Sequence, residues 1–426
     1  MKYIANAYFA LLVLVGFLPD NSMPIDYKGF HWLLWGGINT SYLIFILVFN
    51  RKFKLPKSPV VLTFLSFFII SCFSIFVAIN KIESIVRLTD LYVIASSIII
   101  CYIFINDKLI TKKFIFWLII TKLSVELIWG YWQLYSLTDG FNSPFVANYS
   151  SFLKSIYGNK NVTSFSLLIQ FTLLMSFFSY LKSKYLRICI ILLGTFTFYI
   201  LLLLSTRAIF VSLIIAVCLL ILLLILKFVR TKIFLTSDIK IFSIYILMIL
   251  LPLTYFNIKN QDKDVEVANR IIQISDFEKD ESVSSRFRFW SHSLSSIKEK
   301  PFLGRGIGNW KIFATKYDSE KMFSYVVPYT THNDFLEIFA ETGILGFLSY
   351  LGFFLFILKK NLFNFFSWTE SRLNTSHVFL LLCLMYFFID SNLNFPLVRP
   401  LMQIVLILFI VANEILNQNL ANNEKF

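Results

Sequence analysis

The chain has 426 residues, of which 57% are hydrophobic and only 15% are charged. This composition is that of a polytopic membrane protein and not of a soluble domain. The formal net charge of +14 comes from 39 basic and 25 acidic residues. Much of the excess lies in short loops between apolar runs, so membrane topology explains it and no nucleic-acid partner is expected. The five cysteines all lie inside apolar runs without metal-ligand spacing, which predicts neither a disulfide framework nor a metal site.

About twelve apolar runs are long enough to cross roughly 30 Å of hydrocarbon. They lie near 3–19, 30–49, 58–79, 88–105, 114–135, 161–181, 187–204, 208–226, 239–256, 343–358, 377–394 and 398–415. The first run lacks a cleavage site of small residues, so it is expected to be a retained span. We therefore predict an all-α polytopic membrane protein with about nine spans in 1–256, a polar loop or cap region in 257–342, and about three spans in 343–426.

Lys and Arg cluster in alternate loops, which determines the expected orientation. The basic loops are 51–57, 108–113, 182–187, 227–232 and 359–372. By the positive-inside rule they are cytoplasmic, together with both termini. The unusual polar segments then face the opposite compartment; they are 158–161, 205–207, 257–342 and 390–396. A cavity assembled from several of these loops at the outer membrane surface is expected.

The 257–342 interval is too long for an unstructured loop. Residues 286–298 carry Phe287, Trp290, Leu294 and Ile297 at helical spacing and end at Lys300-Pro301. Asn333 or Asp334 is suited to cap a second helix that runs into Glu341, and Gly343 then precedes the next span. The interval is expected to form a small helical cap on the membrane.

Four arginines on the outer side are candidates for binding an anion, because the planar guanidinium matches phosphate. They are Arg207, Arg286, Arg288 and Arg305. Arg207 lies between two apolar runs. The alternative to a role in binding the substrate anion is that it is a turn arginine that binds lipid headgroups. Arg286 and Arg288 point to different faces of a helix, so at most one is expected to join Arg207. The alternative for the cap arginines is that they are solvated cations.

The segment Gly304-Arg305-Gly306-Ile307-Gly308 has no preceding strand, so it is not a nucleotide-binding loop. A turn that brings amides close to an anion, or that packs a helix tightly, is expected. His332 precedes a helix N-terminus, which lowers the imidazole pKa and favours the neutral form that a general base requires. Taken without further context, a structural histidine is the other interpretation.

Three acidic features have two interpretations each. Asp334, Glu337 and Glu341 share one helix face, which is either solvated or orients a sugar acceptor. Asp262-Lys263-Asp264 matches the DxD pattern of metal-dependent sugar-nucleotide transferases, although three-residue matches arise by chance. Lys122 and Glu126 lie four residues apart inside a span, where an ion pair is expected and a proton relay is the alternative.

The order of these motifs resembles the O-antigen ligase and O-antigen polymerase superfamily. The resemblance covers the second half of the chain best. It rests on Gly158-Asn159-Lys160-Asn161, Ser205-Thr206-Arg207, Arg286 four residues before Trp290, Pro301-Phe302-Leu303-Gly304-Arg305-Gly306-Ile307-Gly308-Asn309-Trp310, His332-Asn333-Asp334-Phe335 and Glu341-Thr342-Gly343-Ile344-Leu345-Gly346.

The resemblance implies an all-helical transferase of the GT-C type with a periplasmic cap. Such proteins move a glycan from undecaprenyl diphosphate to an acceptor hydroxyl, here lipid A-core or another glycan, without a metal or cofactor. It implies that His332, Arg207 and Arg286 are catalytic. It also implies that substrate contacts come from Arg288, Arg305, Asn333, Asp334 and Asn161.

The implied location is a bacterial inner membrane, with the active site facing the periplasm. A repeat-unit polymerase of the same superfamily is the alternative, and protein O-glycosylating members share the motifs. A lipid-linked-sugar transporter or flippase is the alternative of another class. A transporter would show related halves and polar groups near the midplane. Here the polar groups gather at one face, which favours an enzyme.

Overall fold

The computed structural model describes residues 1–18, 29–49, 56–141, 150, 152–232, 236–259, 281–319, 329–367 and 371–418. Every regular element in these ranges is a helix. In chain order the α-helices are α1 (Lys2–Val15), α2 (Gly29–Phe49), α3 (Pro59–Ser74), α4 (Lys81–Asn106), α5 (Lys112–Leu137), α6 (Lys160–Met175), α7 (Lys184–Leu204), α8 (Arg207–Thr231), α9 (Thr236–Lys259), α11 (Glu281–Glu299), α12 (Trp310–Asp318), α13 (Asp334–Ser367), α14 (Ser371–Leu393) and α15 (Pro400–Gln418). Short 3-10 helices follow α3, α6 and α14 and precede α6.

The predicted all-α membrane fold is confirmed. Within the described residues, ten helices are long and apolar enough to cross a membrane. The two remaining predicted spans are also helical, but the apolar helices there, Lys2–Val15 and Ile239–Tyr255, are shorter. A helix thus occupies each of the twelve predicted positions.

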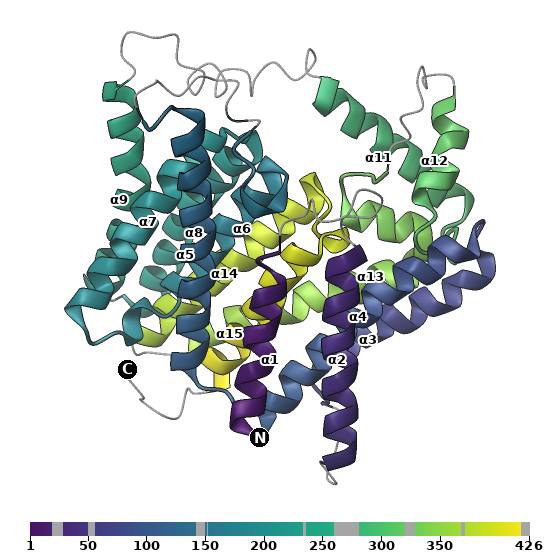
Figure 1. The fold of residues 1–426 in the computed structure, drawn as a ribbon, viewed down its shortest axis with the longest axis horizontal. Coiled ribbons are helices and arrows are strands. Elements are labelled where there is room, and N and C mark those ends of the chain that lie inside the picture. The colour runs from purple at the N-terminus through teal and green to yellow at the C-terminus, as the bar shows by residue number, and fades with distance from the viewer. Residues whose placement is uncertain are drawn as a thin grey trace.

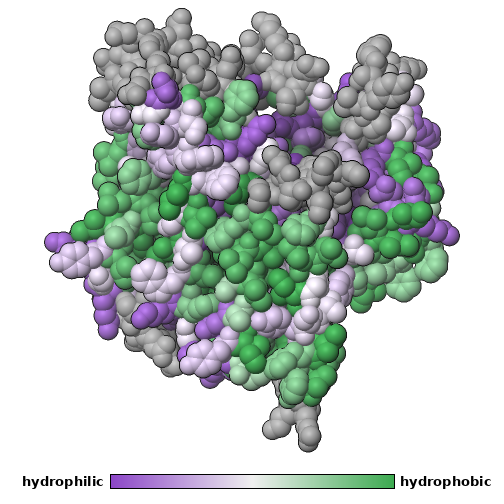
Figure 2. Space-filling model, viewed as in Figure 1, coloured by the Kyte–Doolittle hydropathy of each residue, from purple (hydrophilic) through white to green (hydrophobic). Residues whose placement is uncertain are grey.

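Successive long helices cross the bundle in alternate directions (Figure 1). The ends of α2, α4, α6, α8 and α13, near the basic loops, therefore come to the side where the N-terminus lies. The cap helices α11 and α12 lie at the opposite side, which is the upper side in Figure 1. On the face shown in Figure 2, hydrophobic residues form a belt across the middle of the molecule, and hydrophilic residues gather above and below it. This arrangement is that of a multi-pass membrane protein.

The core of the bundle consists of helices that are apolar on all sides. α15 is buried along its whole apolar window, and the window that contains α6 is 94% buried. α2 and α8 are only 22% and 28% buried, so they lie at the periphery and present their apolar faces to lipid.

The cap is attached to the first part of α13. Ile297 of α11 packs with Trp310 and Phe313 of α12 and with Ala340 of α13 in a separate small hydrophobic cluster. α13 is interrupted at Gly343, which has φ 72°. A Cβ there would lie only 2.0 Å from the carbonyl oxygen of Phe302, so the position requires glycine. As the sequence predicted, a short cap helix precedes the membrane-spanning part of α13.

Candidate functional site

His332 is held in a tight turn immediately before α13. Its φ of 56° is left-handed, a conformation that a non-glycine residue adopts only when its neighbours hold it there. The Thr331 hydroxyl accepts a hydrogen bond from the Asn333 amide at 3.0 Å, and the Thr331 amide donates to Glu337 at 2.9 Å. The Asn333 side chain accepts from Leu336 N at 3.0 Å and so caps α13. The turn therefore positions the imidazole through hydrogen bonds on both sides of it.

Aromatic and cationic groups surround the His332 ring. The ring meets Phe395 edge to face at 4.8 Å between centroids, and the Arg399 guanidinium carbon lies 4.8 Å from the centroid of the same Phe395 ring. Burial, and then the positive charges of Arg286 and Arg399, lower the pKa of His332 to about 4. The neutral imidazole is thus favoured, as expected, although burial and arginines cause the shift and not the helix N-terminus. Its buried Nδ1 has no hydrogen-bond partner among the described residues.

Arg399 is the residue that sequence reasoning missed. It lies one position before α15, at the edge of an apolar run, and so did not stand out from the other span ends. A signal was nevertheless present: Arg399 lies at the end of a span opposite to the ends near the basic loops, where the positive-inside bias disfavours basic residues. The turn between α14 and α15 places it beside His332.

The three cap arginines have different surroundings. Arg286 acts electrostatically on His332, whereas Arg288 Nε lies 3.1 Å from Asp318 Oδ1. The prediction that the two would point to different faces is thus confirmed. The Arg305 guanidinium donates to Ser296 Oγ at 2.8 Å, to Tyr317 Oη at 3.2 Å and to the Glu299 carboxylate. The contacts of Arg288 and Arg305 lie within the cap, so the geometry favours Arg286 as the cap arginine of the site.

Arg207 and Asn161 both lie at the end of the bundle where the cap lies (Figure 1). Arg207 is half-buried at the first position of α8, after Ser205 ends α7 with a left-handed φ of 49°. Asn161 is in the first turn of α6, and its amide donates to the capping side chain of Asn159 at 2.9 Å. Both helices begin on the side where the cap lies (Figure 1). Their roles at a substrate stay predictions.

The glycine segment binds a carboxyl group of the protein, that of Glu341, whose pKa is raised to about 8 by burial. The amides of Gly308 and Trp310 donate to the two carboxylate oxygens of Glu341 at 2.8 and 2.7 Å. Gly306 has φ 93°, and a Cβ there would lie 2.4 Å from the Cβ of Ala78. The turn therefore packs against the start of α4 and binds α13 at the same time. Both features expected of this turn are present in one structure.

The interpretation of Asp334, Glu337 and Glu341 as a solvated face is wrong. Asp334 and Glu341 are 3% and 2% exposed, and Glu337 is half-buried. Asp334 accepts a hydrogen bond from Leu397 N at 3.1 Å, and Asn333 Nδ2 donates to Asn392 at 3.3 Å. This face is buried because it packs against the turn between α14 and α15. The contacts of Asn333 and Asp334 with these residues hold the turn that contains His332 in place.

Two other sequence features have different outcomes. Lys122 and Glu126 are fully buried and form the expected ion pair, and Tyr157 Oη lies 2.9 Å from Lys122 Nζ and 2.6 Å from Glu126 Oε1. Asp262-Lys263-Asp264 lies outside the described residues. The ion pair is thus confirmed, and the metal-binding motif stays untested.

Comparison with known proteins agrees with the motif order. Residues 190–351 match the model of the O-antigen ligase family. No curated protein matches the chain. The matched residues run from α7 into α13, so they contain Arg207, the cap and His332, whereas Arg399 follows them. This match supports the resemblance of the chain to the O-antigen ligase and polymerase superfamily, whose members are glycosyltransferase-like ligases and polymerases.

Proposed function

We propose that the protein is an O-antigen ligase-type glycosyltransferase. It transfers a whole glycan from undecaprenyl diphosphate to a hydroxyl of lipid A-core at the periplasmic face of the bacterial inner membrane. The observation that carries the proposal is His332, which is half-buried and neutral, has a buried Nδ1 without a hydrogen bond, and lies close to Arg286 and Arg399. A neutral imidazole beside cations can take a proton from a hydroxyl while the cations stabilise an anionic leaving group.

The reaction proceeds in one displacement. His332 removes the proton from the acceptor hydroxyl, whose oxygen attacks the anomeric carbon from the face opposite the diphosphate. The carbon–oxygen bond to the diphosphate breaks, and undecaprenyl diphosphate leaves with the electron pair. The glycosidic bond therefore forms with inversion. Arg207 and Arg286 stabilise the charge that develops on the leaving group, and a divalent cation is not required for this step.

The test is transfer by the purified protein in detergent or liposomes. The protein receives undecaprenyl-diphosphate-linked glycan and lipid A-core, without nucleotide and without an ion gradient. We expect a new glycosidic product and free undecaprenyl diphosphate in equal amounts. If the lipid-linked glycan crosses the liposome membrane and no glycosidic product forms, the protein is a transporter and the proposal is wrong.

The orientation is part of the same proposal and has its own test. We expect both termini in the cytoplasm and the cap in the periplasm, because of the charge bias of the loops. A single cysteine at Ser291, which is exposed on α11, should react with an impermeant thiol reagent from the periplasmic side of a cysteine-free variant. Exclusive labelling from the cytoplasmic side would reverse the orientation.

A further inference from the structure

A groove of about 740 Å³ lies between α2, the first turns of α4 and the cap. The lining residues include four aromatic ones, Trp32, Tyr92, Trp310 and Tyr329. None of the residues to which we assign the transfer chemistry lines it. The groove therefore needs a separate explanation.

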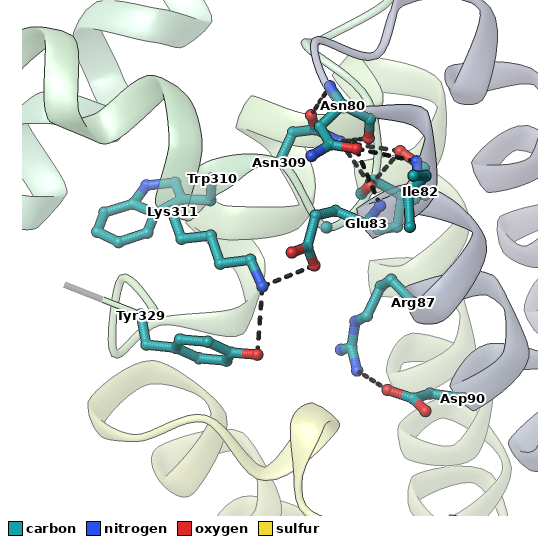
Figure 3. Close-up of polar contacts among 12 residues, drawn as sticks. Asn80, Ile82, Glu83, Arg87, Asp90, Asn309, Trp310, Lys311 and Tyr329 are labelled. Carbon is teal, nitrogen blue, oxygen red and sulfur yellow. Dashed lines mark hydrogen bonds and ion pairs between the residues drawn. The ribbon is translucent and has the colours of Figure 1, made fainter. Parts of the chain in front are cut away.

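Cations and carboxylates line the groove together. Lys311 at the start of α12 reaches across to Glu83 of α4 at 2.7 Å and to Tyr329 Oη at 3.3 Å (Figure 3). One turn further along α4, Arg87 Nη1 lies 3.3 Å from Asp90 Oδ2. The lining residues carry four carboxylates, Glu83, Asp90, Glu337 and Glu341, and two cations, Arg87 and Lys311. Burial raises the pKa of Glu341 to about 8, so at neutral pH three ionised carboxylates and two cations leave one formal negative charge, and the groove disfavours phosphate-rich ligands.

One end of the groove reaches the turn that holds His332. Thr330 and Val398 line this end, and they lie two residues before His332 and one residue before Arg399. Glu337 also lines the groove while it binds the Thr331 amide. A ligand in the groove would thus reach the imidazole from the side of α2 and α4, whereas Arg286 belongs to α11 in the cap.

The other wall of the groove is a membrane-facing helix. Leu33 of α2 lines the groove and is 72% exposed, and Ile44 on the same helix is 57% exposed. A ligand in the groove can therefore keep a lipid portion in the bilayer along α2. Aromatic faces together with hydrogen-bonding carboxylates are suited to hydroxyl-rich sugar rings.

We propose that this groove binds the acceptor, as a lipid-carried glycan whose reacting end bears few or no phosphates. The inference rests on the proposed transfer function and deepens it, because it assigns the acceptor to the side of α2 and α4 and the diphosphate of the donor to the arginines. The carboxylates of the groove hydrogen-bond the acceptor hydroxyls and direct one of them to His332. The same carboxylates repel an acceptor with phosphorylated sugars near the reacting hydroxyl.

A tryptophan at Gly37 tests the location of the acceptor. Gly37 lines the groove, and a Cβ there would meet no atom within 4 Å, so a large side chain can enter the groove without displacing the protein. We expect Gly37→Trp to raise the KM for lipid A-core by about tenfold or more and to leave the KM for the lipid-linked donor unchanged. The matched control is Ile44→Trp, which adds the same ring to the same helix outside the groove and should leave both constants unchanged.

The charge of the acceptor is tested with two forms of lipid A-core. One carries its core phosphates and the other has lost them by phosphatase treatment. We expect the wild-type protein to have a KM for the dephosphorylated form lower by about tenfold, because like charges brought together weaken binding. Glu83→Gln should narrow the difference, because it removes one negative charge beside Lys311.

A labelling measurement keeps the location testable if Gly37→Trp fails to fold. Thr40 lines the groove and is exposed, so a cysteine there in a cysteine-free variant should react with a thiol reagent. Dephosphorylated lipid A-core should slow this reaction. Normal transfer with wild-type acceptor KM in Gly37→Trp, or no protection of the Thr40 cysteine, overturns the groove assignment alone. Failure of the wild-type protein to transfer to either acceptor overturns the proposed function, and the groove assignment with it.

Discussion

The carboxylate of Glu341 should determine whether the cap has a fixed structure. It accepts hydrogen bonds from the amides of Gly308 and Trp310 at 2.8 and 2.7 Å, and the Trp310 amide is buried. A buried N–H that loses its acceptor costs about 1–3 kcal/mol. Glu341→Ala leaves the buried Trp310 amide and the half-buried Gly308 amide without this acceptor, so we expect a loss of about 1–4 kcal/mol in the free energy of unfolding. Glu341→Gln keeps one acceptor oxygen, so its loss should be about half as large.

The assay is thermal unfolding of the detergent-solubilised protein, followed together with trypsin cleavage after Arg305. Both variants should unfold at lower temperature, in the order wild type, Gln, Ala, and cleavage at Arg305 should become faster because the turn is released. The matched control is Asp107→Asn, the same acid-to-amide change at an exposed carboxylate away from the cap, which should alter neither the unfolding temperature nor the cleavage at Arg305. If both Glu341 variants unfold and are cleaved like the wild type, the carboxylate does not organise the glycine turn.

The other predictions concern the groups around the transferred glycan. His332→Gln should lower the transfer rate by about 10²–10⁴-fold while thermal stability changes little, and a near-normal rate would leave the imidazole only a positioning role. Because the base acts in its neutral form and the pKa of His332 is about 4, the rate should hold from neutral pH to about 5 and fall as the pH drops through about 4; a fall centred near 6.5 would contradict this environment. Arg207→Lys and Arg286→Lys keep the charge but lose the bidentate geometry, so each should lose about 10²–10³-fold in rate, and normal turnover in both would assign the leaving group to other residues. Arg399→Gln should raise the pKa of His332 and so shift the acid limb of the rate profile to higher pH, whereas Arg399→Lys should restore it; an unmoved limb would mean that Arg399 only packs on Phe395.

The elements of the fold could be predicted from the sequence because they depend on local properties. The length of each apolar run determines whether it can cross a bilayer, and the Lys and Arg of each loop determine on which side that loop stays. A helix was found at each of the twelve predicted positions for this reason. The helix cap at Asn333 and the break at Gly343 are equally local, because they depend on one side chain and one backbone conformation.

The partners of the polar groups were decided only by the tertiary structure. Residue spacing alone did not show which partners Arg286, Arg288 and Arg305 have, and it left the helix face of Glu341 either solvated or oriented toward a sugar acceptor. In the folded protein Arg305 forms an ion pair with Glu299, and Glu341 accepts a hydrogen bond from the glycine segment. Packing also brought Arg399, more than sixty positions after His332, beside that imidazole. A charged group takes its partner from the helix faces that meet it in three dimensions, and no local pattern of residues encodes which faces will meet.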